Sequence, residues 1–261
     1  MKALSFVKYE GTGNDFVVLA GDDAASFEVG WAPALCDRHF GIGADGVLLV
    51  LPPVTPGARG RMRVVNADGS EPEMCGNGLR CVALALAASE ESFVVDTGAG
   101  AKSCTLHRDA SGWSVTVSMG SVRYLEARSL DTGIDTHAAH LVDAGNPHAI
   151  LFGPVAPEER ARVGKTLEVH PAFPNRTNVE FATLGADGIE LVVWERGVGF
   201  TLACGTGACA TVVAAWQLGL LAEPRVKVQL PGGPLWIERG AGDEVTMTGP
   251  ARRVFDGTWS P

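Results

Sequence analysis

The chain has 261 residues, of which 46% are hydrophobic and 20% charged, so it can bury a core in one large domain or two medium ones. Its formal net charge of −9 argues against a nucleic-acid partner, which would favour a basic surface. No run reaches the roughly 18 apolar residues that span a bilayer, and the N-terminus lacks the features of a signal peptide, so we expect a cytoplasmic protein with no membrane partner.

Short apolar or alternating segments predict strands along the whole chain, separated by turns at the numerous glycines and prolines. In chain order these strands are residues 16–19, 46–51, 61–65, 113–119, 190–195, 225–230, 234–238 and 244–248. Helices are predicted at 31–39, after Cys75 and after Cys204. The last two are apolar on nearly every face, which is typical of a helix that is buried all round.

Two short sequence motifs are nearly the same. Residues 74–81 read MCGNGLRC and residues 203–210 read ACGTGACA, with Cys75 and Cys204 separated by 204 − 75 = 129 positions. In each motif, the second residue is a cysteine at the start of a predicted buried helix. The repetition suggests that the two halves of the chain carry equivalent structures.

A second match has nearly the same spacing, because Gly13-Asn14 recurs as Gly145-Asn146. Together the matches indicate a duplication. They predict a first half over 1–120, completed by 250–261, and a second half over 121–249. The predicted fold is α+β, with two pseudo-symmetric halves, each a curved, mostly antiparallel, barrel-like sheet wrapped round one central apolar helix.

The start of a helix gives a cysteine a specific chemistry. The first backbone N–H groups lack intrahelical partners and the dipole is positive there, which lowers a thiol pKa and attracts a carboxylate. If the halves face each other across a cleft, two thiols reach one carbon from opposite sides, one as base and one as acid. This arrangement would invert a stereocentre.

Other interpretations of Cys75 and Cys204 stay open on the residues alone. Both can be packing residues at tight turns, the role we expect for Cys36, Cys81, Cys104 and Cys209. They can form a redox disulfide, which requires Cα atoms within about 7 Å. The cleft can also belong to a binding module without catalysis.

We expect neither a metal nor a cofactor. The cysteines lack the C-x-x-C spacing of zinc sites, and HAAH at 137–140 has no third ligand nearby. GIGADG at 41–46 matches a dinucleotide fingerprint, but it precedes a predicted strand rather than joining a strand to a helix. We therefore predict a turn there.

Six motifs, taken in order, resemble those of the diaminopimelate epimerase family. They are EGTGNDF (10–16), GIGADG (41–46), NADGSEPEMCGNGLRC (66–81), GNPH (145–148), RTNVEF (176–181) and ERGVGFTLACGTGACA (195–210). The resemblance implies a homodimeric, cofactor-independent isomerase that interconverts LL- and meso-2,6-diaminopimelate in lysine and peptidoglycan biosynthesis. A proline or hydroxyproline racemase of the same broad fold, which also uses two thiols, is the alternative.

The resemblance also implies roles for individual residues. Cys75 and Cys204 would be the acid/base pair, and His148 would support them. Helix-start amides and polar side chains would bind the small-molecule substrate, namely Gly76, Asn77, Gly205 and Thr206 together with Asn14, Asn66, Asn146, Asn178, Glu195 and Arg196. Gly46 stands where some members carry a glutamine, and it cannot make a side-chain contact.

These implied roles suit a substrate that is zwitterionic at both ends. An arginine binds a carboxylate with two parallel hydrogen bonds, a glutamate pairs with an ammonium, and asparagines serve both groups. On residue type alone, Glu195 and Arg196 could equally be a solvated surface pair and Asn66 a turn residue.

Overall fold

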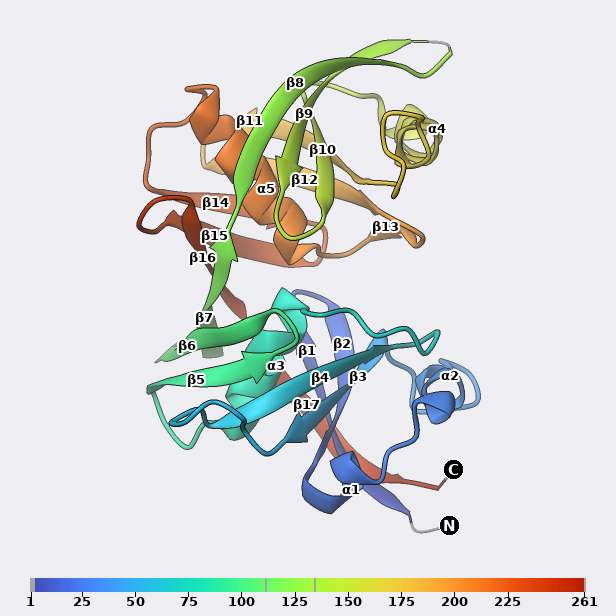
Figure 1. The fold of residues 1–261 in the computed structure, drawn as a ribbon, viewed down its shortest axis with the longest axis vertical. Helices are drawn as coiled ribbons and strands as arrows, with labels where there is room; N and C mark the ends of the chain where they lie inside the picture. The colour runs from blue at the N-terminus through green and yellow to red at the C-terminus, as the bar shows by residue number, and fades with distance from the viewer. Residues whose placement is uncertain (1–2, 111, 134, 261) are drawn as a thin grey trace. The chain divides into compact units, whose positions relative to one another are not determined.

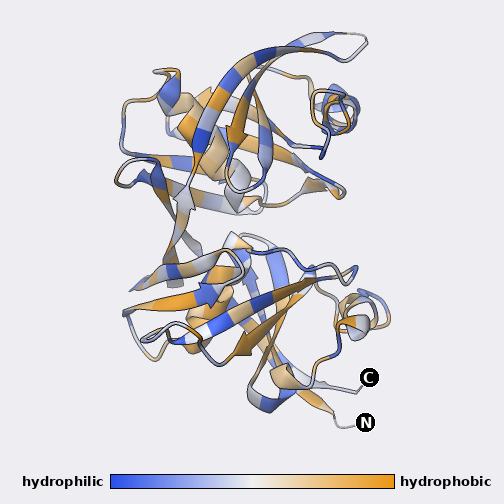
Figure 2. Cartoon of the chain, viewed as in Figure 1, coloured by the Kyte–Doolittle hydropathy of each residue, from blue (hydrophilic) through white to orange (hydrophobic). Residues whose placement is uncertain are grey.

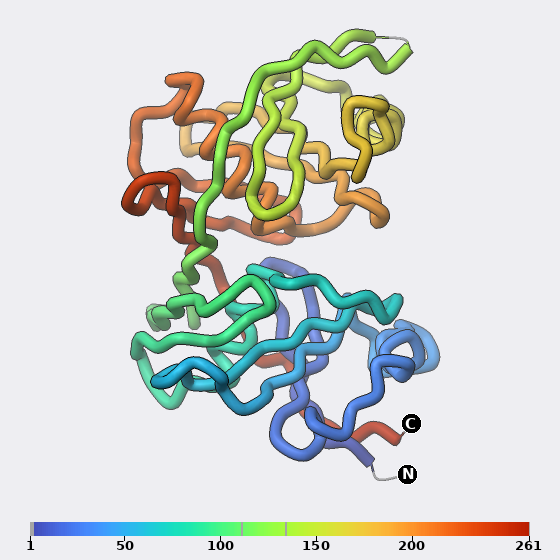
Figure 3. Tube along the Cα trace, viewed as in Figure 1, coloured from blue at the N-terminus to red at the C-terminus, as the bar shows by residue number. Residues whose placement is uncertain are grey.

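Strands dominate the structure, a computed structural model that describes residues 3–110, 112–133 and 135–260 (Figure 1). The chain divides into unit 1, residues 1–118 and 248–261, and unit 2, residues 119–247. It leaves unit 1 within β7 (Gly112–Ser121) and returns to it within β16 (Glu244–Pro250). Both ends of the chain therefore belong to unit 1, where the first and last strands pair (Figure 3).

Unit 1 is a curved, open sheet with helices packed on it. Its other strands are β1 (Leu4–Gly11), β2 (Asn14–Ala20), β3 (Gly46–Leu51), β4 (Gly60–Asn66), β5 (Ser92–Thr97), β6 (Gly100–Asp109) and β17 (Arg252–Trp259). Strands β2 and β3, and also β4 and β5, pair in parallel, whereas β1–β2, β1–β17, β3–β4, β5–β6 and β6–β7 are antiparallel. The helices are α1 (Gly21–Ala25), the 3-10 turn η1 (Val29–Trp31), α2 (Ala32–Cys36) and α3 (Gly76–Leu86).

Unit 2 repeats this plan. Its strands are β8 (Arg123–Asp131), β9 (Thr136–Asp143), β10 (Pro147–Phe152), β11 (Asn178–Gly185), β12 (Gly188–Glu195), β13 (Gly199–Thr201), β14 (Arg225–Leu230) and β15 (Gly233–Arg239). Most neighbours are antiparallel, while β10–β11 and β12–β14 are parallel. The helices are α4 (Pro157–Glu168) and α5 (Gly205–Gln217).

The central helices α3 and α5 are buried as the sequence predicts. Residues 76–83 of α3 are all buried, and α5 has buried residues on every side. α3 contacts β1, β2, β3, β4, β6 and β17, and α5 contacts β8–β12, β14 and β15. Cys81 and Cys209, which lie on these helices, are fully buried, which confirms their packing role. Among the described residues, no two cysteines are joined by a disulfide.

The predicted strands are confirmed, and β3 stands out as a nearly continuous apolar strand in Figure 2. The helix predicted at 31–39 is wrong at its end, because it stops at Cys36. Asp37 has extended ψ, and its carboxylate accepts hydrogen bonds from the backbone N–H groups of His39 and Phe40. Those bonds replace the helical ones that would continue α2.

Strand register extends the internal repeat. In unit 1, Phe16 of β2 lies beside Gly46 of β3, and in unit 2, His148 of β10 lies beside Asn178 of β11. Both pairs are parallel, and both are separated by the same offset, since 148 − 16 = 178 − 46 = 132. The two units are thus pseudo-symmetric residue by residue along these strands.

Candidate functional site

Cys75 and Cys204 have the same local geometry at the start of the two buried helices. Cys75 is the N-cap of α3, with φ −136° and ψ 113°, and Cys204 is the N-cap of α5, with φ −123° and ψ 108°. Each sulfur accepts a hydrogen bond from the backbone N–H three residues on, Gly78 or Gly207, at 3.4 Å. We call these two helix starts the unit 1 half-site and the unit 2 half-site.

The glycine three residues after each cysteine lets a strand come close to the helix. A Cβ at Gly78 would lie 3.0 Å from Leu48 Cδ2, and one at Gly207 would lie 2.8 Å from Glu180 Oε1. Leu48 and Glu180 belong to β3 and β11, the equivalent strands of the two units. The glycines are therefore required by packing against these strands, in addition to any role at the helix start.

In the unit 1 half-site, Asn14 and Asn77 lie together. Asn77 Nδ2 donates to Asn14 Oδ1 at 3.2 Å, and Asn14 Nδ2 donates to Asp45 Oδ2 at 2.7 Å. Arg80, fully buried on α3, donates to Asn77 Oδ1 at 3.0 Å and to Thr12 Oγ1 at 2.7 Å. Arg80 and Asp45 lie in MCGNGLRC and GIGADG, but they are not among the predicted site residues.

Asn66 lies at the end of β4, opposite Gly46 of β3. Its Nδ2 donates to Ser70 Oγ at 2.9 Å, and its carbonyl accepts from Gly69 N at 2.9 Å, so it opens a tight turn. The next residue, Ala67, donates to the carbonyl of Asp45 at 3.2 Å. Through Asp45, this turn is connected to Asn14.

The unit 2 half-site contains a continuous polar chain that leads to the thiol. His148 Nε2 lies 2.9 Å from Asn146 Oδ1, and Asn146 Nδ2 lies 3.4 Å from Thr206 Oγ1. Thr206 Oγ1 is 3.5 Å from Cys204 Sγ. The structure thus brings together four of the residues predicted for the site.

His148 has a second partner that the sequence did not suggest. Its Nδ1 lies 2.6 Å from Glu180 Oε1, and both side chains are completely buried. Glu180 is two residues after Asn178 in β11, so strand alternation places both on the face toward α5. Glu180 also lies in the motif RTNVEF (176–181), but neither that motif nor the spacing from Asn178 shows that it pairs with His148.

Glu195 lies beside Cys204. It accepts a hydrogen bond from Thr201 Oγ1 at 2.5 Å and another from the Cys204 thiol, while burial raises its pKa despite these bonds. Glu195 follows Trp194, which pairs with Val179 of β11. In unit 1, Asn66 follows Val65, which pairs with Val47 of β3. Glu195 and Asn66 therefore occupy equivalent places in the two units.

The surroundings of Cys204 set its protonation. Burial raises the pKa of its thiol well above the usual value, and the carboxylates of Glu195 and Glu180 raise it further. Hydrogen bonds from Thr206 and Gly207 act in the other direction but are outweighed. The expected lowering of the thiol pKa at a helix start is therefore wrong for Cys204, because two carboxylates and the removal of water offset the positive end of α5.

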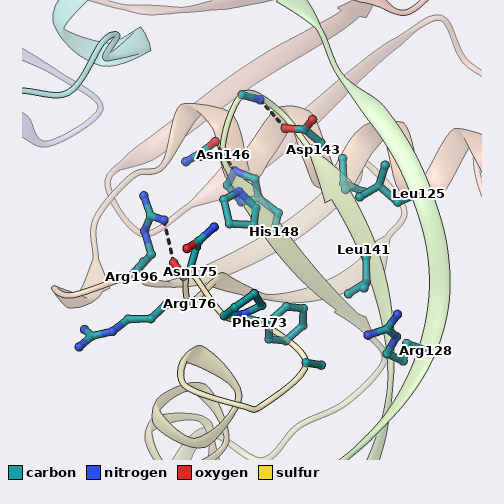
Figure 4. Close-up of a pocket in the computed structure, with 15 residues that line it drawn as sticks. Leu125, Arg128, Leu141, Asp143, Asn146, His148, Phe173, Asn175, Arg176 and Arg196 are labelled. Atoms are coloured by element: carbon teal, nitrogen blue, oxygen red, sulfur yellow. Dashed lines mark hydrogen bonds between the residues drawn. The ribbon is translucent and has the colours of Figure 1, made fainter.

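A pocket of about 750 Å³ opens in unit 2 next to this chain (Figure 4). Asn146, His148 and Arg196 line it, and Arg128 and Arg176 add further positive charge. Figure 4 shows Arg196 turned toward the loop of Asn175, whose carbonyl accepts from Arg196 Nη1 at 2.9 Å. Asp143 also lines the pocket, but the three arginines outweigh its charge, so the pocket suits an anionic group.

Asn178 is 4% exposed and is held at both ends of its amide group. Its Nδ2 donates to the carbonyl of Pro147 at 3.1 Å, and its Oδ1 accepts from the backbone N–H of Arg196 at 2.9 Å. It thus fixes the chain at Arg196, and any contact with a ligand would come in addition. Glu195 and Arg196 have separate partners rather than each other.

The four helix-start residues of the prediction occupy the first turns of the buried helices. Gly76 and Asn77 begin α3, and Gly205 and Thr206 begin α5. Backbone N–H groups at such positions have no partner within the helix. Among the described residues, no cluster of three or more His, Cys, Asp or Glu side chains could hold a metal ion.

Comparisons with known proteins agree on one family. The model of the diaminopimelate epimerase family matches residues 6–125 and 140–254. A diaminopimelate epimerase of Cyanothece sp. is 44% identical, with 98% of this chain and 99% of that protein covered. A chloroplastic diaminopimelate epimerase of Oryza sativa subsp. japonica is 43% identical, with 98% of this chain and 80% of that protein covered.

Solved structures share the fold at much lower identity. A hydroxyproline epimerase of Agrobacterium vitis, solved with bound trans-4-hydroxy-L-proline, superposes with a TM-score of 0.75 at 16% identity, over 99% of this chain and 91% of that one. No helix in residues 3–110, 112–133 or 135–260 is both long enough and apolar enough to cross a membrane.

Proposed function

The chain belongs to the diaminopimelate epimerase family, and we propose that it interconverts LL- and meso-2,6-diaminopimelate by a cofactor-independent reaction with two thiols. The observation that carries the proposal is the matched geometry of Cys75 and Cys204, each the N-cap of a buried helix in one of two repeated units. A single base removes a proton, whereas inversion of a carbon needs a proton donor on the opposite face.

In the proposed reaction the α-carbon loses one proton and gains another. The thiolate of Cys75 takes the α-proton from one face, and the C–H electron pair stays on the carbon next to the carboxylate. The thiol of Cys204 then delivers its proton to the other face, and the roles reverse for the other stereoisomer. Backbone N–H groups at the starts of α3 and α5 bind the carboxylate and stabilise its growing charge.

The resting protonation follows from the surroundings of Cys204. Its raised pKa favours the thiol at neutral pH. Because the reaction needs one thiolate and one thiol, we assign the resting thiolate to Cys75. The enzyme in this state is ready for the stereoisomer whose α-proton faces Cys75.

The far end of the substrate has a carboxylate and an ammonium group. We assign the carboxylate to Arg196, which lines the unit 2 pocket, and the ammonium to acceptor oxygens among the polar side chains of the site. The proposed substrate-binding set besides Arg196 is Asn14, Asn66, Asn146, Asn178 and Glu195, of which Glu195 lies beside Cys204 and therefore at the reacting end. Groups that would stay unpaired with a shorter substrate make the far end selective.

The central test is the exchange of the α-hydrogen with solvent deuterium, measured by NMR on each stereoisomer. We expect Cys75→Ala and Cys204→Ala each to abolish epimerisation, with exchange from one face only in any residual activity. Cys81→Ala is the matched control, because this buried cysteine lies in the same motif but packs in the core; we expect it to keep turnover and lose about 1 kcal/mol of stability. Full turnover by either alanine variant of the pair would overturn the two-thiol proposal.

Turnover, binding and disulfide measurements separate the alternatives. Turnover of proline or trans-4-hydroxyproline without turnover of diaminopimelate would favour the racemase activity instead. Binding of diaminopimelate without turnover would favour a binding module. A native disulfide between Cys75 and Cys204 in alkylated protein would favour a redox role.

We further propose a cytoplasmic homodimer, on the basis of the family resemblance. The rice relative is named as chloroplastic, so the compartment varies among relatives. Light scattering coupled to gel filtration tests the dimer, with a mass near twice 27.3 kDa expected. Cell fractionation tests the compartment.

A further inference from the structure

Unit 2 buries a pair of ionisable side chains that the proposed reaction does not use directly. His148 Nδ1 and Glu180 Oε1 are 2.6 Å apart, and neither side chain is exposed to solvent. A buried ion pair is often no more stabilising than apolar residues of the same size, because both groups lose their hydration. Its presence here points to a reason other than stability.

The internal repeat shows what the fold alone requires at this place. At an offset of 132, His148 corresponds to Phe16 and Glu180 to Leu48. Phe16 and Leu48 are buried, at 3% and 0% exposure. The same packing position between the paired strands and the helix is thus filled by an apolar pair in one unit and by an ionisable pair in the other.

The ionisable pair is connected to Cys204. His148 Nε2 lies 2.9 Å from Asn146 Oδ1, so an oxygen atom faces each nitrogen of the ring. A carboxylate or amide oxygen only accepts, so each ring nitrogen has an acceptor beside it. This geometry suits a ring that donates from both nitrogens, with Glu180 supplying the compensating charge. Asn146 continues the chain to Thr206, whose hydroxyl contacts Cys204.

The carboxylate of Glu180 is also held against the start of α5. Its Oε1 is 2.8 Å from where a Cβ of Gly207 would be, and Gly207 N donates to Cys204 Sγ. Its buried Oε2 accepts no hydrogen bond from the described residues. Oε1 therefore contacts His148 Nδ1, and it is the only Glu180 oxygen with a hydrogen-bond partner among the described residues.

We propose that Glu180 is a positioning residue of the unit 2 half-site: it holds His148 as a double donor and thereby fixes the amide of Asn146 beside Thr206 and Cys204. This inference rests on the proposed function for its effect on turnover, but the state of the His148 ring can be measured without any substrate. The charge of Glu180 also contributes to the raised pKa of Cys204, which agrees with this location.

The first experiment compares Glu180→Gln with Glu190→Gln, an exposed glutamate on β12. In protein labelled with ¹⁵N-histidine, NMR should show His148 with protons on both ring nitrogens in the wild type and in Glu190→Gln, and on one nitrogen in Glu180→Gln. His148→Gln assigns the signals. We expect kcat of Glu180→Gln to fall on the order of 10²-fold, because a displaced group near the reacting atoms costs about that much.

The second experiment installs the apolar pair of unit 1. The double variant His148→Phe with Glu180→Leu should fold and unfold at a urea midpoint no lower than that of the wild type, yet lose epimerisation. Turnover like the wild type in this double variant would overturn the proposal. An unchanged His148 ring with unchanged kcat in Glu180→Gln would overturn it too. If the wild type fails to epimerise diaminopimelate, the proposed function fails, while the ring signature still tests the pair.

Discussion

Cys75 and Cys204 have nearly the same backbone angles and the same hydrogen bond to sulfur, yet their side chains differ in surroundings. Cys204 is 6% exposed and next to Glu195 and Glu180, whereas Cys75 is half-buried. Equal backbone geometry with unequal burial and charge around the two thiols agrees with the proposed reaction, which needs one acid and one base at rest.

At the residue scale, this difference predicts the reactivity of Cys204. Glu195 is the carboxylate that raises the pKa of Cys204 most, so Glu195→Gln should lower that pKa. More thiolate then forms at pH 8, and iodoacetamide should alkylate Cys204 about ten-fold faster, since one neighbouring charge shifts a pKa by about one unit or more. Mass spectrometry of the Cys204 peptide gives the rate, with Glu190→Gln as control. Equal rates in both variants would contradict the assignment.

At the element scale, one carboxylate fixes the loop that carries Arg196. Glu168 at the end of α4 accepts from Trp194 Nε1 at 2.8 Å and from Gly197 N at 2.9 Å, and it pairs with Arg176 at 3.4 Å. Burial alone would raise the pKa of Glu168, but these partners outweigh it and the pKa is lowered. Arg176 itself has a positive φ of 59°, so the loop needs such support.

The sign of the pH dependence follows from this lowered pKa. Stabilisation by Glu168 is fully present above the pKa of an unfolded glutamate, about 4.3, and is lost as the pH falls through the lower folded value. Glu168→Gln should therefore lower the free energy of unfolding by about 1–2 kcal/mol at pH 7, with a shrinking difference below pH 4. Urea unfolding across this range measures it, and Glu190→Gln should show no such trend. A difference that grows toward acid would refute the assignment.

Parts of the elements could be predicted from the sequence and others could not. α3 and α5 were predictable because almost all their residues are apolar. α4 was missed because its sequence is mostly polar and it buries only a narrow stripe, with Val163 and Leu167 at its centre. β10 (Pro147–Phe152) was missed because residues 148–151 are all buried, so the strand shows no alternation of apolar and polar residues.

The site shows the same limit. Cys75, Cys204 and the glycines beside them recur in the sequence and could be found there. Glu180 could not, because its role depends on β10 and β11 being neighbours and on Gly207 being close. The pKa of Cys204 likewise depends on carboxylates from β11 and β12 that sequence alone does not bring near it.

At the scale of the whole molecule, each unit has its own buried helix and its own set of strands. Unit 1 includes residues from both ends of the chain, and β17 pairs along β1. Segments that are far apart in the sequence but belong to one unit should therefore lose their protection from amide hydrogen exchange together when that unit unfolds.

Hydrogen exchange tests this division. Leu79 is fully buried on α3, so Leu79→Ala should cost unit 1 about 2–5 kcal/mol and speed amide exchange over β1–β6 and also over β17. Peptides from β9–β15 should keep their protection. Val212→Ala on α5 is the reciprocal variant and should give the opposite pattern. Equal loss throughout the chain in both variants would mean that the units unfold as one.

The pairing of β1 with β17 has a consequence for synthesis. Translation delivers β1 before unit 2, and it delivers β17, which pairs with β1, only after unit 2. The N-terminal unit therefore has to wait with an open sheet edge, while the inserted unit already has all its strands. Although most of unit 1 is synthesised before unit 2, unit 2 is the first to have all its strands during elongation, and the sheet edge of unit 1 is covered only when β17 follows.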